Sequence, residues 1–341
     1  MKEFNGRSVK LVVAILIVVF GLGGLFVGVK IFESNASNND KNLVANVSSS
    51  EQEEQNIISI EGVNYAQRKG ISTILLIGLD STGEMKSSSS YVNTERCDFV
   101  SLLVFDENSK TCNIIQLNRD SMVEIPVLTV TGEKNGTVIG QLALAHTYGS
   151  GSSDSCRNVV DTVENLLYGS SIDHYVCLNM DAIGKANDLI GGVEVEVLDD
   201  FENVESLKKG ETVTLMGDIA MIYVRGRKGT GDQTNISRME RQKQYMNAFV
   251  KKLKYSYARN SNLVVSMYSS ISPYMISDCS SNTFVELSEF LSDFELEDII
   301  IPEGESVDGE EFVEFYVDDE DLKNIVIDLM YDEITITENT D

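Results

Sequence analysis

The first hydrophobic stretch of the chain is long and uncharged. Residues 11–29 contain no charged side chain, and nineteen such residues can cross a bilayer as a helix. Lys2, Arg7 and Lys10 precede the run, whereas basic and acidic side chains are mixed after it. This asymmetry predicts a cytoplasmic tail over residues 1–10, a transmembrane helix over residues 11–32 and a single-pass cell-membrane protein whose remainder is extracellular. A cleaved signal peptide is the alternative, but residues 33–36 form a poor cleavage site.

Beyond this helix, the hydrophobic pattern alternates between strands and helices. Residues 33–70 are rich in Asn, Ser, Glu and Gln and predict an extracellular spacer, in which residues 56–64 are a candidate strand. Strands are then predicted over residues 73–80, 99–105, 112–117, 174–179 and 193–197, and helices over residues 141–148, 156–167, 181–190 and 237–254. This mixture predicts an α/β fold over residues 71–258, with a mixed central sheet flanked by helices in three layers.

The last part of the chain is strongly acidic. Residues 260–341 contain twenty-two Asp and Glu, and Lys323 is their only basic residue. Helices are predicted over residues 284–294 and 319–331. We expect residues 259–341 to pack on the α/β domain rather than to fold independently.

Charge narrows the classes of partner. The formal net charge is -27, and such a protein lacks the cationic surface that nucleic-acid binding requires, so DNA and RNA are excluded as partners. Residues 207–259 are the exception, with twelve Lys and Arg against four Asp and Glu. A local anion site is therefore expected within an acidic protein.

The basic stretch also has the local sequence of a binding loop. Arg225 and Arg227 follow an apolar element, and Gly226, Gly229 and Gly231 then permit close approach of the backbone to a ligand. Ser237-Arg-Met-Glu240 matches a capping box, which predicts a helix that carries Arg238 and Arg241 on its first turn. Planar guanidinium groups suit phosphate oxygens. The alternative is a solvated basic face, or ion pairs with the acidic tail.

Two aspartates border the predicted strands. Asp80 ends the strand 73–80, and Asp98 precedes the strand 99–105. Arg96 lies two residues before Asp98, and Arg119 follows the strand 112–117. If the two strands are neighbours, these acids meet at one edge of the sheet and provide hard oxygen ligands for Mg²⁺ or Mn²⁺. Each aspartate taken alone is better explained as a turn or cap residue.

The cysteines and histidines predict no further site. Five cysteines without a CxxC pair indicate neither a zinc site nor a disulfide framework, so buried apolar thiols are expected, although a bridge such as Cys156 to Cys177 stays open. His146 falls on an apolar helix and His174 opens a strand, which disfavours a histidine relay or a zinc site.

Several ordered motifs resemble those of the LytR–CpsA–Psr family. They are Ile77-Gly-Leu-Asp80, Arg96-Cys-Asp98, Asn118-Arg-Asp120, Gly191-Gly-Val193, Tyr223-Val-Arg-Gly-Arg227 and Arg238-Met-Glu-Arg-Gln242. The resemblance covers residues 72–254 and implies a membrane-attached phosphotransferase. Such an enzyme moves a glycopolymer, for example a teichoic acid or capsule, from an undecaprenyl-pyrophosphate carrier to the peptidoglycan of a Gram-positive wall.

The resemblance also implies roles for individual residues. Asp80 and Asp98 would hold a metal ion, Mg²⁺ or Mn²⁺. The pyrophosphate would be bound by Arg96, Arg119, Arg225, Arg227, Arg238, Arg241 and Gln242. Arg119, Arg225, Arg227 and Asp232 would be catalytic, with Asp232 orienting arginines, and the lipid would lie in an apolar tunnel between sheet and helices.

The chain departs from the family pattern at two places. Cys97 stands where the family commonly has Ser or Thr, and Gln141 and Ala143 stand where it commonly has a Lys-x-Asn motif. The second change removes one phosphate contact and bears on substrate preference. A polyprenyl-pyrophosphate phosphatase and a non-catalytic lipid- or wall-binding regulator are the alternative functions, and Asp98, Asp120 and Asp232 are equal candidates for the general base.

Overall fold

A computed structural model describes residues 56–85, 95–260, 262–279 and 294–335 of the chain. The predicted cytoplasmic tail and transmembrane helix, most of the predicted spacer and the predicted helix 284–294 up to residue 293 lie outside these ranges. Within the ranges, every helix is too short or too polar to cross a membrane.

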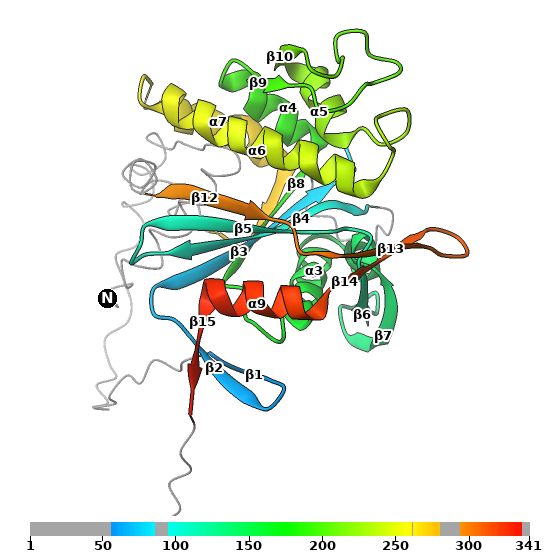
Figure 1. Cartoon of the computed structure of the whole chain (residues 1–341), viewed down its shortest axis with the longest axis vertical. Coiled ribbons are helices and arrows are strands. Elements are labelled where there is room, and N and C mark those ends of the chain that lie inside the picture. Colours follow the sequence, from blue (N-terminus) through cyan, green and yellow to red (C-terminus); the bar gives the residue numbers. More distant parts are fainter. Residues whose placement is uncertain (1–55, 86–94, 261, 280–293, 336–341) are drawn as a thin grey trace, which may run out of the picture.

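A six-stranded mixed sheet forms the centre of the fold (Figure 1). In spatial order its strands are β11 (Met275–Ser277), β8 (His174–Asn179), β3 (Ile71–Leu79), β4 (Cys97–Asp106), β5 (Thr111–Leu117) and β12 (Glu295–Ile300). The pairs β3–β8 and β5–β12 are parallel, and the other pairs are antiparallel. The strands predicted over residues 73–80, 99–105, 112–117 and 174–179 are thus confirmed.

Both faces of the sheet are covered, because its strands are apolar on both sides. In β3, Ile74 and Leu76 face one core, and Leu75 and Ile77 face the other. The first core is closed by α4 (Met180–Leu189), α5 (Gly217–Arg225), α6 (Asn235–Tyr257) and α7 (Leu263–Ile271). The second is closed by the 3₁₀ helix η1 (Leu142–Tyr148), α3 (Ser152–Leu166) and α9 (Asp319–Met330). The mixed, three-layer α/β prediction is confirmed.

Short strands pair outside the central sheet. β1 (Ile57–Ile60), β2 (Val63–Gln67) and β15 (Tyr331–Ile334) form one small sheet. The two-stranded pairs are β6 (Met122–Leu128) with β7 (Lys134–Gln141), β9 (Val193–Glu196) with β10 (Thr212–Leu215), and β13 (Gly304–Asp308) with β14 (Val313–Val317). A second 3₁₀ helix, η2 (Ser272–Tyr274), follows α7.

The acidic C-terminal segment is interwoven with the domain. It supplies β11 and β12 to the central sheet, and β15 pairs with β2 from the end of the predicted spacer. The predicted boundary at residue 258 therefore does not separate the acidic segment from the central sheet. Residues 56–67, most of which were predicted as spacer, form paired strands within the same structure. β12 is parallel to β5, and a parallel pair needs a long connection between its two strands. Hydrophobic periodicity reports only local structure, so it could not predict this pairing.

Two helices begin at residues other than those predicted. α6 starts at Asn235, because the Thr234 hydroxyl accepts the Ser237 N–H at 3.1 Å, so the N-cap lies three residues before Ser237. α4 is capped by Asn179, whose side chain accepts the Asp181 N–H at 3.1 Å. The predicted helix over 141–148 is largely the 3₁₀ helix η1.

Candidate active site

A β-bulge presents Asp98 to the α6 side of the sheet. Leu79 pairs with Cys97 and Gly78 pairs with Phe99, so Asp98 is an extra residue with no partner opposite it. Cys97 consequently points into the core on the α3 side. Asp98 and Phe99 both line a pocket on the other side. Strict alternation would have placed Asp98 on the face away from α6.

Arginines from two distant segments converge on this carboxylate. Arg119, which follows β5, bonds to Asp98 Oδ1, and Arg238 Nη1 of α6 lies 3.6 Å from Asp98 Oδ2. Arg119 Nε also lies 3.4 Å from Asp120 Oδ1, and Arg227 Nη1 lies 4.0 Å from Asp120 Oδ2. The side chains of Arg238 and Asp120 are each only 4% exposed, whereas that of Arg227 is 42% exposed. Arg119, Arg227 and Arg238 of the predicted array therefore form one connected cluster with Asp98 and Asp120.

Asp120 is held from several directions. Its backbone N–H donates to Asn118 Oδ1 at 2.9 Å, and Gln141 Nε2 donates to its Oδ1 at 3.1 Å. The same Gln141 amide donates to the carbonyl of Val313 at 2.8 Å, and Phe315 N–H donates to the Asp120 carbonyl at 2.9 Å. The C-terminal hairpin β13–β14 therefore supports the cluster, and Gln141, a departure from the family pattern, has a positioning contact.

The first turn of α6 is tied to the end of β5. Asn235 Nδ2 donates to Asn118 Oδ1 at 2.5 Å, and Arg238 Nη2 bonds to Asn235 Oδ1. Further along α6, Gln116 Nε2 of β5 donates to Gln242 Oε1 at 2.9 Å, and Gln242 Nε2 donates to the carbonyl of Val224 at 3.1 Å. These bonds fix the position of α6, and therefore of Arg238, relative to the central sheet.

The cluster has more positive charge than its carboxylates balance. Burial, followed by repulsion from Arg119, lowers the pKa of Arg238 to about 9. Burial also lowers the pKa of Arg119, and the charges of Arg227 and Arg96 add to this effect. The buried Nε of Arg238 has no hydrogen-bond acceptor among the described residues, and that of Arg119 has only its 3.4 Å ion-pair contact with Asp120. Unpartnered buried donors under mutual repulsion indicate a site for an anion.

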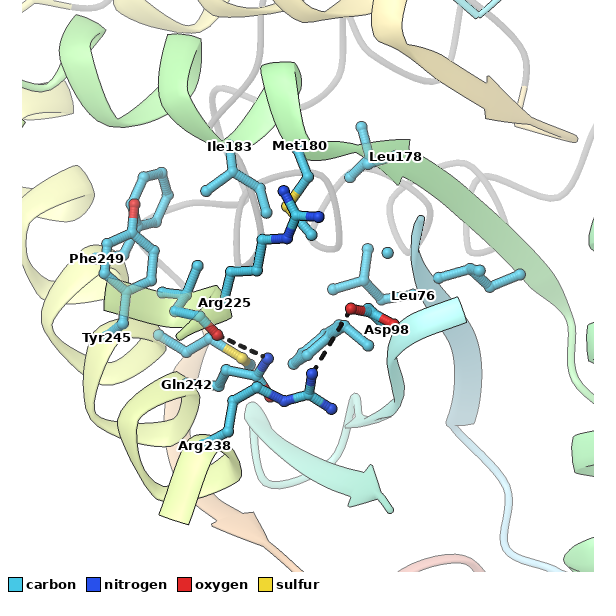
Figure 2. A pocket seen from close by; sticks show the side chains of 15 residues that line it. Leu76, Asp98, Leu178, Met180, Ile183, Arg225, Arg238, Gln242, Tyr245 and Phe249 are labelled. Carbon is cyan, nitrogen blue, oxygen red and sulfur yellow. Dashed lines mark hydrogen bonds and ion pairs between the residues drawn. The ribbon is translucent and has the colours of Figure 1, made fainter. Parts of the chain in front are cut away.

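An apolar pocket extends from this cluster between the sheet and the helices. It spans about 780 Å³, part of which is open to solvent, and its charged lining residues are Asp98, Arg225 and Arg238 (Figure 2). Much of the remaining lining is formed by Leu76, Leu178, Met180, Ile183, Tyr245 and Phe249. Arg238 and Phe249 are eleven residues apart on α6, so the pocket follows about 16 Å of that helix. This shape suits a molecule with a long apolar part and an anionic head.

The remaining predicted site residues have different surroundings. Arg96 is exposed, and its backbone N–H donates to Asp80 Oδ1 at 3.0 Å beside the bulge. Arg225 is exposed at the pocket, and Gln242 lies in its lining. The structure thus places Asp98, Arg225 and Arg238 in the pocket lining, with Arg119 paired to Asp98 and with Asp80 beside the bulge.

Arg241 and Asp232 do not have the places expected of them. Arg241 is fully buried, and its guanidinium bonds to Asp199, to Ser237 Oγ at 3.2 Å, to the Tyr223 carbonyl at 3.2 Å and to that of Gly226. Arg241 therefore holds the arginine loop in place instead of facing a ligand.

Asp232 lies on an exposed turn. Its Oδ1 accepts the N–H and hydroxyl of Thr234 at 2.9 and 2.8 Å. The carboxylates that contact the arginines are Asp98, Asp120 and Asp199. Asp199 carried no sequence signal, because only the packing of β9 and α6 brings it to Arg241.

The donor set at the bulge fits a magnesium-type ion. Asp80 and Asp98 follow and begin neighbouring strands, as their pairing register shows. Each carboxylate has about four lone-pair sites, so Asp98 can accept from arginines and still ligate a cation. Mg²⁺ is commonly bound by one or two carboxylates together with substrate phosphates. Asp80 and Asp98 would hold such an ion beside the arginine cluster, where it would neutralise the charge of a bound anion.

A family comparison agrees with this architecture. The model of the LytR_cpsA_psr family matches residues 29–326. The chain belongs to the LytR–CpsA–Psr family.

Curated relatives of this LytR–CpsA–Psr protein are named as polyisoprenyl-teichoic acid–peptidoglycan teichoic acid transferases. TagU of Halalkalibacterium halodurans is 31% identical over 52% of each chain. TagV of Bacillus subtilis is 29% identical over 46% of this chain and 39% of its own length. TagU of Bacillus anthracis is 28% identical over 68% of each chain. The chain thus aligns with 52% of the length of the first of these relatives and with 39% of the second.

Solved structures share the fold. TagV of B. subtilis has a TM-score of 0.57 at 24% identity, with 77% of this chain and 96% of that chain covered. Protein gbs0355 of Streptococcus agalactiae has a TM-score of 0.63 at 18% identity, covering 76% and 86%. A structure of TagT bound to LIIa-WTA has a TM-score of 0.55 at 21% identity, covering 76% and 90%.

Proposed function

We propose that this LytR–CpsA–Psr protein is a membrane-anchored phosphotransferase that moves a glycopolymer from an undecaprenyl-pyrophosphate carrier to peptidoglycan outside the cell. The observation that carries the proposal is the pocket, whose apolar length leads to Arg225, Arg238 and Asp98. A polyprenyl chain would occupy the apolar part, and its pyrophosphate would meet the arginines. The transmembrane helix over residues 11–32 would keep the pocket at the outer membrane surface, where such lipids are presented. The names of the relatives support this substrate class.

The reaction would proceed as a phosphoryl transfer. A hydroxyl of peptidoglycan would attack the polymer-side phosphorus, its new P–O bond would form as the bridging P–O bond breaks, and lipid monophosphate would leave. Arg119, Arg227 and Arg238 would stabilise the charge on the bridging and leaving oxygens. Of the three carboxylates considered as general base, Asp98 lines the pocket and Asp232 lies on an exposed turn. Asp98 is also the proposed metal ligand and is paired with two arginines, so we assign the hydroxyl proton to no single one of Asp98, Asp120 and Asp232.

Product analysis tests this function directly. The full chain in detergent is incubated with a glycan linked to polyprenyl pyrophosphate, with and without peptidoglycan oligomers. We expect lipid monophosphate to appear in step with glycan-linked peptidoglycan, and only when the acceptor is present. Equal release without acceptor would identify a phosphatase instead. Binding without any release would identify a lipid-binding regulator, and either result contradicts the proposal.

Metal dependence is a separate prediction of the same site. We expect EDTA to stop transfer, and Mg²⁺ or Mn²⁺ to restore it. Asp80→Asn keeps the acceptor for the Arg96 N–H but removes a charge, so it should raise the metal concentration needed for half activity at least about tenfold. Asp106→Asn, at the opposite end of β4, is the matched control and should leave that concentration unchanged. Full activity in EDTA would contradict the metal assignment.

A further inference from the structure

Three buried side chains converge on the α3 side of the sheet, across from the pocket. They are His146 of η1, Cys156 of α3 and Cys177 of β8, with 2%, 0% and 0% of their surfaces exposed. One ligand atom of each lies within 4.8 Å of the others. The three elements are joined by packing in the second hydrophobic core, so the cluster is a product of the tertiary fold.

The histidine in this cluster has an unsatisfied ring nitrogen. His146 Nδ1 lies 3.2 Å from the carbonyl oxygen of Glu95, and a contact with a carbonyl requires this nitrogen to carry the proton. Nε2 is then a lone pair buried beside the Cys156 thiol, and no hydrogen bond of ordinary geometry satisfies it among the described residues. An unpaired buried acceptor is costly. Anchoring of one ring nitrogen to a carbonyl is also the usual arrangement when the other nitrogen binds a metal.

We propose that His146, Cys156 and Cys177 form a closed structural site for Zn²⁺. Two thiolates and one neutral imidazole would balance the charge of the ion, which an apolar core requires. Zinc would also give His146 Nε2 the partner that it lacks. Ligand atoms around tetrahedral zinc are separated by roughly 3.5 Å, so small side-chain rotations would close the present cluster around the ion.

The fourth ligand position has a candidate in Cys97. This cysteine is fully buried in the same core, close to but outside the group of three side chains whose ligand atoms lie within 4.8 Å of one another. Cys97 directly precedes Asp98, and the bulge that turns Asp98 toward the pocket turns Cys97 toward this cluster. A zinc ion there would tie η1, α3 and β8 to the start of β4 and so stiffen the bulge. This assignment rests on the cluster itself and is independent of the proposed transfer reaction.

Metal analysis of the full chain tests the site. Protein purified without chelator, or refolded with Zn²⁺, should retain one zinc per chain after extensive dialysis, measured by inductively coupled plasma mass spectrometry. Co²⁺ in its place should give thiolate-to-cobalt charge transfer and the intense visible bands of tetrahedral coordination. Cys156→Ser and Cys177→Ser should each lose the bound metal and the charge-transfer band. Cys112→Ser, equally buried but in the other core, is the matched control and should keep both.

A stability measurement covers the case in which a buried serine prevents folding. Chelation should lower the thermal unfolding temperature of the parent chain, and Zn²⁺ should restore it. His146→Gln should remove this response. Absence of zinc together with absence of the cobalt bands would overturn the proposal. An intact mass lower by two hydrogen atoms, restored by reduction, would show a Cys156–Cys177 disulfide instead and would equally contradict it.

Discussion

Replacing Arg238 with alanine is expected to lower the rate of glycopolymer transfer by about 10²–10³-fold, the usual effect of removing one fixed donor to a developing oxyanion. Arg238 is buried in the pocket lining, with its Nε unpartnered and its Nη1 beside Asp98. Its donors are therefore preorganised for a phosphate and would not require reorganisation during the reaction. The measurement is the initial rate of lipid monophosphate release, with binding of a polyprenyl pyrophosphate determined in parallel.

Neighbouring arginines should follow a ranking set by burial. Arg119→Ala should be comparably damaging because its side chain is 11% exposed, whereas Arg227→Ala should be milder because 42% of its side chain faces solvent. Arg238→Lys keeps the charge but loses the planar fork, so it should recover only part of the rate. Lys228→Ala, an exposed cation in the same loop, is the control and should behave as the parent.

Protein stability must be separated from catalysis in these variants. Loss of Arg238 leaves the Asp98 carboxylate with one arginine fewer, which itself destabilises a partly buried charge. The double variant Arg238→Ala/Asp98→Asn relieves that defect and should recover stability but not transfer.

Tight pyrophosphate binding by Arg119→Ala and Arg227→Ala, equal to that of the parent, would refute the phosphate site.

A bulky side chain in the apolar pocket should weaken binding of the lipid chain without affecting binding of the pyrophosphate head group. Ile183→Trp replaces a small aliphatic side chain with a bulky indole ring in the part of the pocket formed by α4. If it excludes about 100 Å² of lipid surface, the loss is about 2.5 kcal/mol, or about sixtyfold in affinity for a long-chain polyprenyl pyrophosphate. Affinity for a short, soluble pyrophosphate should change little, because the arginines are untouched. Isothermal titration with the two ligands gives the comparison.

The control for this variant is a tryptophan outside the pocket. Ile222 of α5 is 37% exposed and is absent from the pocket lining, so Ile222→Trp should bind both ligands as the parent does. Thermal unfolding of Ile183→Trp checks that the first core tolerates the larger side chain. Equal weakening of long and short ligands would show that the apolar pocket is not the lipid site.

Much of the fold was predictable from local pattern. The runs around Ile74, Leu102 and Ile114 are apolar on consecutive positions, as strands covered on both faces must be, and the structure buries them in the central sheet. The arginine-rich stretch was predictable too, because permanent charge in an acidic chain is visible without coordinates. In both cases the information lies in neighbouring residues of one segment.

Contacts between distant segments could only be found in the structure. The bulge that reverses Asp98 depends on the pairing of β3 with β4, and β12 joins the sheet from the segment expected to pack outside it. Arg241 looked equivalent to Arg238 in sequence. In the structure its side chain instead points to Asp199 and the loop carbonyls. Local propensity is set by near neighbours, whereas the burial and partner of a charged side chain are set by long-range packing. The sequence alone therefore identified candidate anion-binding residues, and the tertiary structure decided which of them line one pocket or contact its carboxylates.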